Sequence, residues 1–169
     1  MIEHIIRQYD FNLLYAKALV ADVTEEQMTY VPSKGLVSHP AFTIGHLVTG
    51  SAMMAEDLGA EFKLPEGWGE LFQRKGPNDQ TRPDEDKSKY PTKQVLIAEL
   101  EKQHELLKQY LRISSEERLY RQIKWRFSGY MPTMIDLVIF MCISHEEMHL
   151  GQLAAWRRAM DLPAVLGTL

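Results

Sequence analysis

Residues His145 to His149 read His-Glu-Glu-Met-His, which satisfies the H-E-x-x-H pattern of zinc peptidases. In those enzymes the two histidines bind zinc from successive turns of a helix, and the glutamate acts as general base. A third ligand must follow, either a glutamate or the last histidine of the longer H-E-x-x-H-x-x-G-x-x-H motif. Beyond His149 the sequence has neither, and Gln152 stands where the longer motif requires glycine. The sequence therefore argues against a peptidase of this kind.

The helical period predicts where these two histidines point. At a rotation of about 100° per residue, the residues that share the face of His145 are Val138, Met141, His149, Gln152 and Trp156. The charged residues fall on the opposite side, and they are Asp136, Glu146, Glu147, Arg157, Arg158 and Asp161. We therefore expect both histidines to face the core, where an unpaired imidazole nitrogen costs about 1–3 kcal/mol. A shared metal ion would supply partners, as would carbonyl groups or water, and the pair alone leaves both interpretations open.

A third histidine favours the metal interpretation. His46 lies within residues 40–58, a segment that is apolar on nearly all sides of a helix and is therefore expected to be buried. Three histidines from two helices can hold one divalent ion and leave coordination positions open for water or substrate. The predicted metal ligands are His46, His145 and His149.

Four other polar residues have less specific expectations. Gln152 lies one turn beyond the second histidine of the motif, where it can hold a ligand ring or a substrate, or serve as a buried amide that satisfies the backbone. His39 precedes His46 by two helical turns, about 10 Å, so we expect it to cap the helix or line the mouth of the site. His104 is expected at the core boundary, and Cys142 as a core residue rather than a reactive thiol.

Four segments of the chain carry a helical period. They are residues 2–20, residues 40–58, the stretch from Pro91 to Tyr110, and the stretch from Pro132 to about Asp161. Pro40 suits the first turn of the second helix, with Ser38 or His39 as its cap.

The connections between these segments are unequal. Residues 60–90 are predicted to form a long crossover with one helical turn at Trp68 to Phe72, and residues 112–131 a second irregular link. Such a crossover either shapes a site or straps a few aromatic anchors to the surface. The sequence thus predicts an all-α fold, a four-helix bundle with a long crossover, as a single domain over residues 1–169.

Composition excludes several classes of function. The 169 residues are 45% hydrophobic and 25% charged, which suits one globular domain. The net charge of -4 argues against a nucleic-acid partner. The most apolar run, residues 134–143, contains Asp136 and is shorter than the roughly 20 residues of a membrane span. The single cysteine fits a reducing compartment, and the start MIEHIIRQYD is too charged for a signal peptide. We expect a soluble, cytoplasmic protein with no membrane partner.

Four stretches of the sequence resemble the DinB/YfiT-like superfamily of metalloenzymes. They are HPAFTIGHL at residues 39–47, GWGELFQRKG at 67–76, YPTKQVLIAELEKQHELL at 90–107 and SHEEMHLGQLAAWRRAMDLP at 144–163. The most specific part of the resemblance is the combination of G-H-L with H-x-x-x-H-x-G-Q. It implies a four-helix bundle of unusual connectivity, often a homodimer, with a divalent metal held at His46, His145 and His149.

The resemblance also implies a chemistry. Some members are transferases or isomerases that use low-molecular-weight thiols such as bacillithiol or mycothiol, with zinc or nickel at the site. Phe42 departs from the pattern, since many relatives carry tryptophan there, and this changes the wall of the pocket more than the metal site. We therefore expect a metal-dependent enzyme, a transferase or hydrolase, acting on a small-molecule substrate. The alternative is a non-catalytic metal-binding or stress-related bundle that never uses its open coordination positions.

Overall fold

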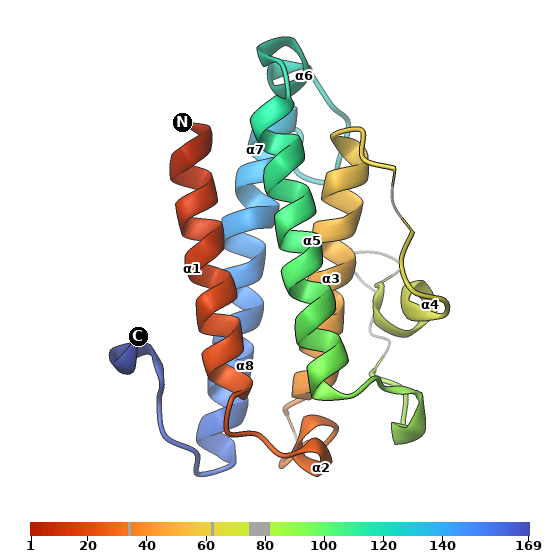
Figure 1. Ribbon diagram of the computed structural model, residues 1–169, viewed down its shortest axis with the longest axis vertical. Helices are drawn as coiled ribbons and strands as arrows, with labels where there is room; N and C mark the ends of the chain where they lie inside the picture. The colour runs from red at the N-terminus through yellow and green to blue at the C-terminus, as the bar shows by residue number, and fades with distance from the viewer. Residues whose placement is uncertain (34, 62, 75–81) are drawn as a thin grey trace.

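Four long helical rods run side by side through the part of the chain that the structure describes (Figure 1). The computed structural model describes residues 1–33, 35–61, 63–74 and 82–169. The rods are α1 (Ile2–Val20), α3 (Pro40–Asp57), α5 (Lys93–Ile113) and a composite of α7 (Met134–Ile139), η2 (Phe140–His145) and α8 (Glu146–Ala159). The predicted all-α four-helix bundle is confirmed. The described residues contain no strand, only an isolated bridge between Gln122 and Thr133.

Side-chain caps determine where three of the rods begin. His39, one of the two predicted caps, accepts a hydrogen bond at Nδ1 from the Phe42 amide at 3.2 Å, and Pro40 follows it at the first position of α3. Thr92 caps α5 in the same way, and Thr133 caps α7 through a capping box. Because these signals are local in the sequence, the predicted starts of the helices lie close to the observed ones.

The directions of the rods explain the long crossover. In Figure 1, α1 runs down the bundle, α3 and α5 both run up it, and the final rod runs down again. Since α3 and α5 are parallel, the chain must return along the bundle between them, and this return carries α4 (Trp68–Phe72) and η1 (Lys87–Lys89). The predicted helical turn at Trp68 to Phe72 is confirmed. Residues 62 and 75–81 of the predicted crossover lie outside the described residues.

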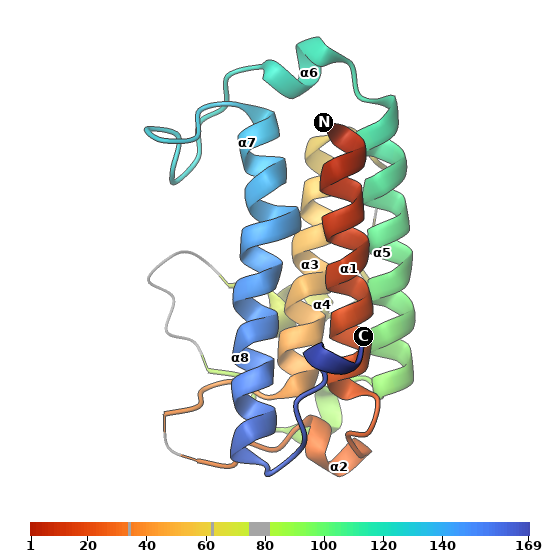
Figure 2. The same ribbon diagram turned by 90° about the vertical axis from the view of Figure 1, so that its left-hand side faces the viewer.

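Two shorter links close the ends of the bundle (Figures 1 and 2). The short helix α2 (Glu25–Met28) lies at the lower end between α1 and α3, and α6 (Glu116–Tyr120) lies at the upper end between α5 and α7. The prediction of an irregular link over residues 112–131 is therefore wrong in part, because α5 continues to Ile113 and α6 follows it. A helix as short as α6 is too short to show a hydrophobic period in the sequence.

A layer of polar residues divides the core. Both α5 and α8 pack against α1 and α3, and apolar clusters fill the upper and lower halves of the bundle. Between the clusters, all four rods contribute buried polar side chains, which are Asn12, Ser51, Gln103, His104 and Glu146. Among the described residues, no helix combines the length and the apolar character needed to cross a membrane.

Two charged residues of the final rod point inward, although the helical period predicts them on the outer face. Glu146 is 3% exposed and its Oε1 lies 2.9 Å from Nε2 of His104, and Arg157 is 1% exposed and pairs with Asp22. His104, at 1% exposed, is likewise buried rather than at the core boundary. Periodicity alone assigns charges to solvent, but Glu146 and Arg157 have partners from other parts of the chain that offset part of the cost of burying them. Nδ1 of His104 is buried without a hydrogen-bond partner.

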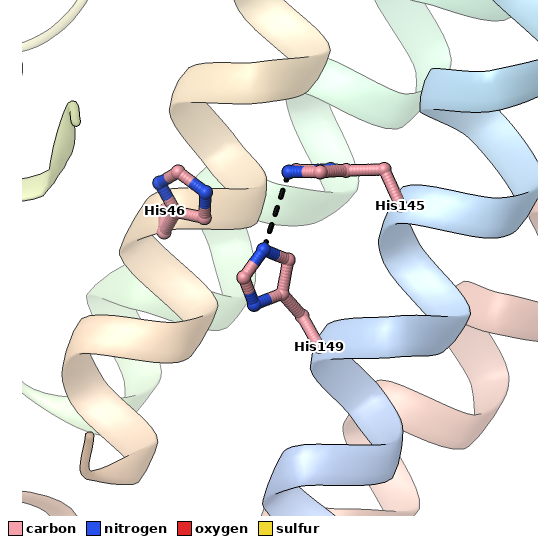
Figure 3. A group of neighbouring side chains, drawn as sticks. All are labelled: His46, His145 and His149. Carbon is pink, nitrogen blue, oxygen red and sulfur yellow. Dashed lines mark hydrogen bonds between the residues drawn. The ribbon is translucent and has the colours of Figure 1, made fainter. Parts of the chain in front are cut away.

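The final rod is continuous but not a regular α-helix (Figure 2). Residues Phe140–His145 form a π-helical segment, in which backbone hydrogen bonds join residues five apart instead of four. The single α-helical period assumed from Pro132 to Asp161 therefore does not hold. The core face of the rod carries Glu146, while His145 and His149, predicted to face the core, are only partly buried at its edge toward α3 (Figure 3).

Candidate metal centre

Three histidines converge between α3 and the final rod (Figure 3). His46 comes from α3, His145 is the last residue of η2 and His149 lies one turn further along α8. One ring nitrogen from each lies within 4.8 Å of the others, and Nε2 of His145 is 3.2 Å from Nε2 of His149. Two nitrogens bound at about 2.05 Å to a tetrahedral ion lie about 3.3 Å apart, so this spacing suits a shared cation. The structure thus brings together all three predicted ligands.

The crossover orients the His46 ring. Nδ1 of His46 lies 2.9 Å from the Phe72 carbonyl oxygen at the end of α4. A carbonyl only accepts hydrogen bonds, so Nδ1 carries the proton and donates it, which leaves Nε2 with a lone pair. Phe72 can approach because Gly45 precedes His46, and a Cβ at Gly45 would overlap the Phe72 ring. The long crossover therefore contributes to the site rather than only covering the surface.

Gln152 orients the His149 ring in the same way. Its Oε1 lies 3.0 Å from Nδ1 of His149, so Nδ1 donates and Nε2 is free to bind. Gln152 is exposed, so the interpretation as a buried amide that satisfies the backbone is wrong. A cavity of about 150 Å³ adjoins this amide, and its lining includes Ser38, Thr43, Gln152 and Trp156.

A glycine of α3 lies opposite the His145 ring. Gly50 lies one turn beyond His46 on α3, and a Cβ placed there would lie 3.6 Å from Cε1 of His145 and 3.3 Å from Cε of Met141. A larger side chain at this position would press on the ring. An alanine Cβ would make ordinary van der Waals contact with His145 and a tight contact only with the flexible end of Met141, so only a side chain larger than alanine would disturb the ring.

Burial holds the three imidazoles in their neutral form. It is the main cause that lowers the pKa of His46, and it lowers the pKa of His145 to about 4 and that of His149 to about 3, with the neighbouring His46 as the second cause for both. Neutral imidazole is the form that binds metal ions. All three side chains are therefore ready to act as ligands at neutral pH.

Acidification is expected to destabilise the metal-free protein. The unfolded chain protonates these histidines near pH 6.5, whereas the folded protein does so only near pH 4 at His145 and pH 3 at His149. Because the unfolded state binds more protons in this window, the free energy of unfolding falls as the pH falls from about 6.5 toward 4. Urea unfolding of chelator-treated protein at pH 7 and pH 5 measures the loss, which is expected to be smaller for His149→Ala. Equal losses in both proteins would contradict the burial of this imidazole.

An aromatic ring and a cation lie on the α3 side of the site. Phe42 stacks against His46 with ring centroids 6.0 Å apart and planes within 6°. The guanidinium carbon of Arg74 lies 5.2 Å from the centroid of the Phe42 ring, and the positive charge of Arg74 also helps to lower the pKa of His46. Phenylalanine at position 42 thus still covers the His46 ring, although the family resemblance led us to expect tryptophan.

A second aromatic cluster lies beside His145. The Phe140 ring is 6.2 Å from the His145 ring, and it packs against Trp125 and Phe127 at 5.5 Å each, between centroids. All three aromatic side chains are partly exposed. Helical periodicity does not predict this aromatic cluster, because Trp125 and Phe127 lie in an irregular link.

The remaining predicted residues lie outside the convergent group. His39 caps α3, as one of its two predicted roles required, and its ring contacts Tyr90 edge-on. Cys142 is fully buried, as predicted, and burial raises the pKa of its thiol. Glu146, which a zinc peptidase would use as general base, is hydrogen-bonded to His104 in the core instead. This contact supports the rejection of peptidase chemistry.

The protein is thus a four-helix bundle with a long crossover between parallel helices, and its three convergent imidazoles form a candidate metal centre. The model of the DinB superfamily matches residues 3–153, and the chain belongs to this superfamily. The conserved protein of a locus from Enterococcus faecalis has a similar solved structure, with a TM-score of 0.71 and 19% sequence identity, covering 95% of this chain and 97% of that one. No curated protein matches the chain. The resemblance inferred from the sequence is therefore confirmed for family and fold.

Proposed function

We propose that the protein is a metal-dependent enzyme that acts on a small molecule, with a divalent ion held by His46, His145 and His149. The observation that carries this proposal is the convergence of the three rings. In two of them the Nδ1–H group donates a hydrogen bond, to the Phe72 carbonyl from His46 and to Gln152 Oε1 from His149. An acceptor on the far nitrogen is the usual arrangement around metal-binding histidines. Imidazole ligands suit zinc and nickel, which are the metals we propose.

The chain's own residues would prepare the site for catalysis. Three neutral ligands leave coordination positions open, and a divalent ion held in this way supplies the Lewis acidity that makes water or a thiol a nucleophile near neutral pH. Phe72 and Gln152 keep two rings in one tautomer and one orientation. The rings of Phe42 and Phe140 lie beside His46 and His145, with ring centroids 6.0 and 6.2 Å apart.

The surroundings favour a small organic substrate over a purely structural ion. The three imidazoles are partly exposed. Gln152, whose Oε1 lies 3.0 Å from Nδ1 of His149, also lines a cavity of about 150 Å³ that the three histidines themselves do not line. A structural metal site is usually closed by four protein ligands. We propose transfer to or from a low-molecular-weight thiol as the reaction class, with hydrolysis of a small molecule as the second candidate because the same Lewis acid activates water.

Elemental analysis followed by an activity screen tests this function. Protein purified without added metal is expected to contain about one zinc or nickel ion per chain, as three ligands from one chain form the site. Metal-loaded protein is then incubated with low-molecular-weight thiols plus electrophiles, and separately with small esters and amides, against chelator-treated protein as control. Bound metal without turnover would support the non-catalytic alternative, and protein that binds neither zinc nor nickel would refute the proposal.

A further inference from the structure

The buried polar layer includes Glu146, the residue that follows the candidate ligand His145, and it has no role in the function proposed above. The Glu146 side chain points into the core, where Nε2 of His104 lies 2.9 Å from its Oε1. Asn12 of α1, 2% exposed, lies near the same carboxylate and works against the rise in the Glu146 pKa that burial causes. Burying polar groups costs free energy, so a layer of them in the middle of a core must have a structural or functional reason.

The π segment (Phe140–His145) gives a reason for the buried polar residues. Where a π turn joins an α-helix the ladder of backbone hydrogen bonds shifts by one residue, and carbonyl groups near the junction need other donors. The carbonyl of Cys142, inside the segment, accepts a hydrogen bond from Nδ2 of Asn12 at 3.1 Å. The amide group of asparagine carries two N–H donors, so one side chain can serve both the Cys142 carbonyl and the Glu146 carboxylate. These two acceptors flank His145 in the chain.

The π turn also reconciles two demands on the final rod. Above it, α7 buries Met134, Ile135 and Val138 in the upper apolar cluster. Below it, α8 buries Leu150 and Leu153 in the lower cluster while two histidines are turned toward α3 (Figure 3). A π turn contains more residues than an α turn, so it rotates one half of the rod relative to the other. Without it, either the upper core or the direction of the histidines would change.

We infer that Asn12 and the His104–Glu146 pair are positioning residues, which clamp the π turn from the core side and thereby aim His145 at the other two ligands. This inference rests on the proposed metal function. It assigns Asn12, His104 and Glu146 of the polar layer to the metal centre, although no hydrogen bond joins these three side chains to the imidazoles in the structure.

Asn12→Ala tests the clamp, with Tyr9→Phe as its matched control. Tyr9 lies on the same face of α1, one turn earlier, and its hydroxyl donates to Ser51 Oγ at 2.7 Å. Its ring stacks on His104 with centroids 3.7 Å apart, and phenylalanine keeps this ring, so the control removes only the hydroxyl. Both variants lose a fully buried hydrogen bond, so both are expected to be destabilised. Only Asn12→Ala is expected to weaken zinc binding, by about 10-fold or more, as measured by competition with a chromophoric chelator. The ligand-field absorption of the cobalt-loaded protein is expected to change in Asn12→Ala and to stay unchanged in Tyr9→Phe.

The outcomes separate the two proposals. If the wild type binds zinc and both variants bind it equally, with the same cobalt spectrum, the clamp is refuted while the metal function stands. If the wild type binds no metal, the proposed function fails and the clamp fails with it. Should Asn12→Ala not fold, Glu146→Gln keeps the shape of the side chain and replaces its carboxyl group by an amide, and an unchanged zinc affinity there would equally refute the inference. Faster deuterium uptake over residues 140–146 in the metal-free Asn12→Ala variant is the expected structural signature.

Discussion

Replacement of His149 by alanine is expected to weaken metal binding so far that the ion is lost on dialysis against a weak chelator. His149 supplies one of three convergent nitrogens, and its Nε2 lies 3.2 Å from that of His145. Metal-binding free energies of about 10–16 kcal/mol in four-ligand sites correspond to about 3 kcal/mol per ligand, so losing one ligand is expected to weaken affinity by about 100-fold. Metal content after dialysis against a weak chelator measures the effect.

The control for this variant is His4→Ala. His4 is an exposed histidine on α1. Within the described part of the chain, the one hydrogen bond of its ring is with Arg7. Its removal is expected to leave the metal content unchanged, which separates the site from adventitious binding by surface histidines. The free energy of unfolding of metal-free His149→Ala is compared with that of metal-free wild type at pH 7. Agreement to within about 1 kcal/mol would show that the loss of metal does not follow from unfolding. Undiminished metal content in His149→Ala would rule out the proposed ligand set.

Gly45→Ala is expected to damage both the fold and the site. A Cβ at this position would overlap the Phe72 ring, which is fully buried and therefore cannot swing into solvent. Forcing extra atoms into a packed core typically costs about 1–3 kcal/mol. The same displacement would withdraw the Phe72 carbonyl from Nδ1 of His46, and the loss of such a partner typically weakens metal affinity by about 10–100-fold. Urea unfolding and chelator competition measure the two effects.

Gly151→Ala is the matched control, because it places the same methyl group within a helix. A Cβ at Gly151 meets no heavy atom within 4 Å. In a helix interior, alanine is more favourable than glycine by about 0.5–1 kcal/mol, so this variant is expected to be slightly more stable than wild type and to bind metal normally. If Gly45→Ala behaved like Gly151→Ala in both measurements, Phe72 would not be seated against α3 as the structure has it.

Short-range signals in the sequence determined the helices and the candidate ligands. The apolar stripes, Pro40 and the caps before α3 and α5 depend on residues within one or two turns of each other, so they can be read from the chain alone. The spacing of His145 and His149, and the apolar segment around His46, were likewise sufficient to name three histidines that the structure brings within 4.8 Å.

Only the tertiary structure decided which groups hold and surround these histidines. Phe72 lies 26 residues from the His46 that it orients, and His104 lies 42 residues from the Glu146 that it pairs with in the core. Helical periodicity placed Glu146 on the solvent side because the period weighs each side chain by its own polarity and contains no information about partners from other rods. The π turn was hidden for the same reason. The Cys142 carbonyl inside it accepts a hydrogen bond from Asn12, 130 residues away, and a donor that distant enters no local pattern.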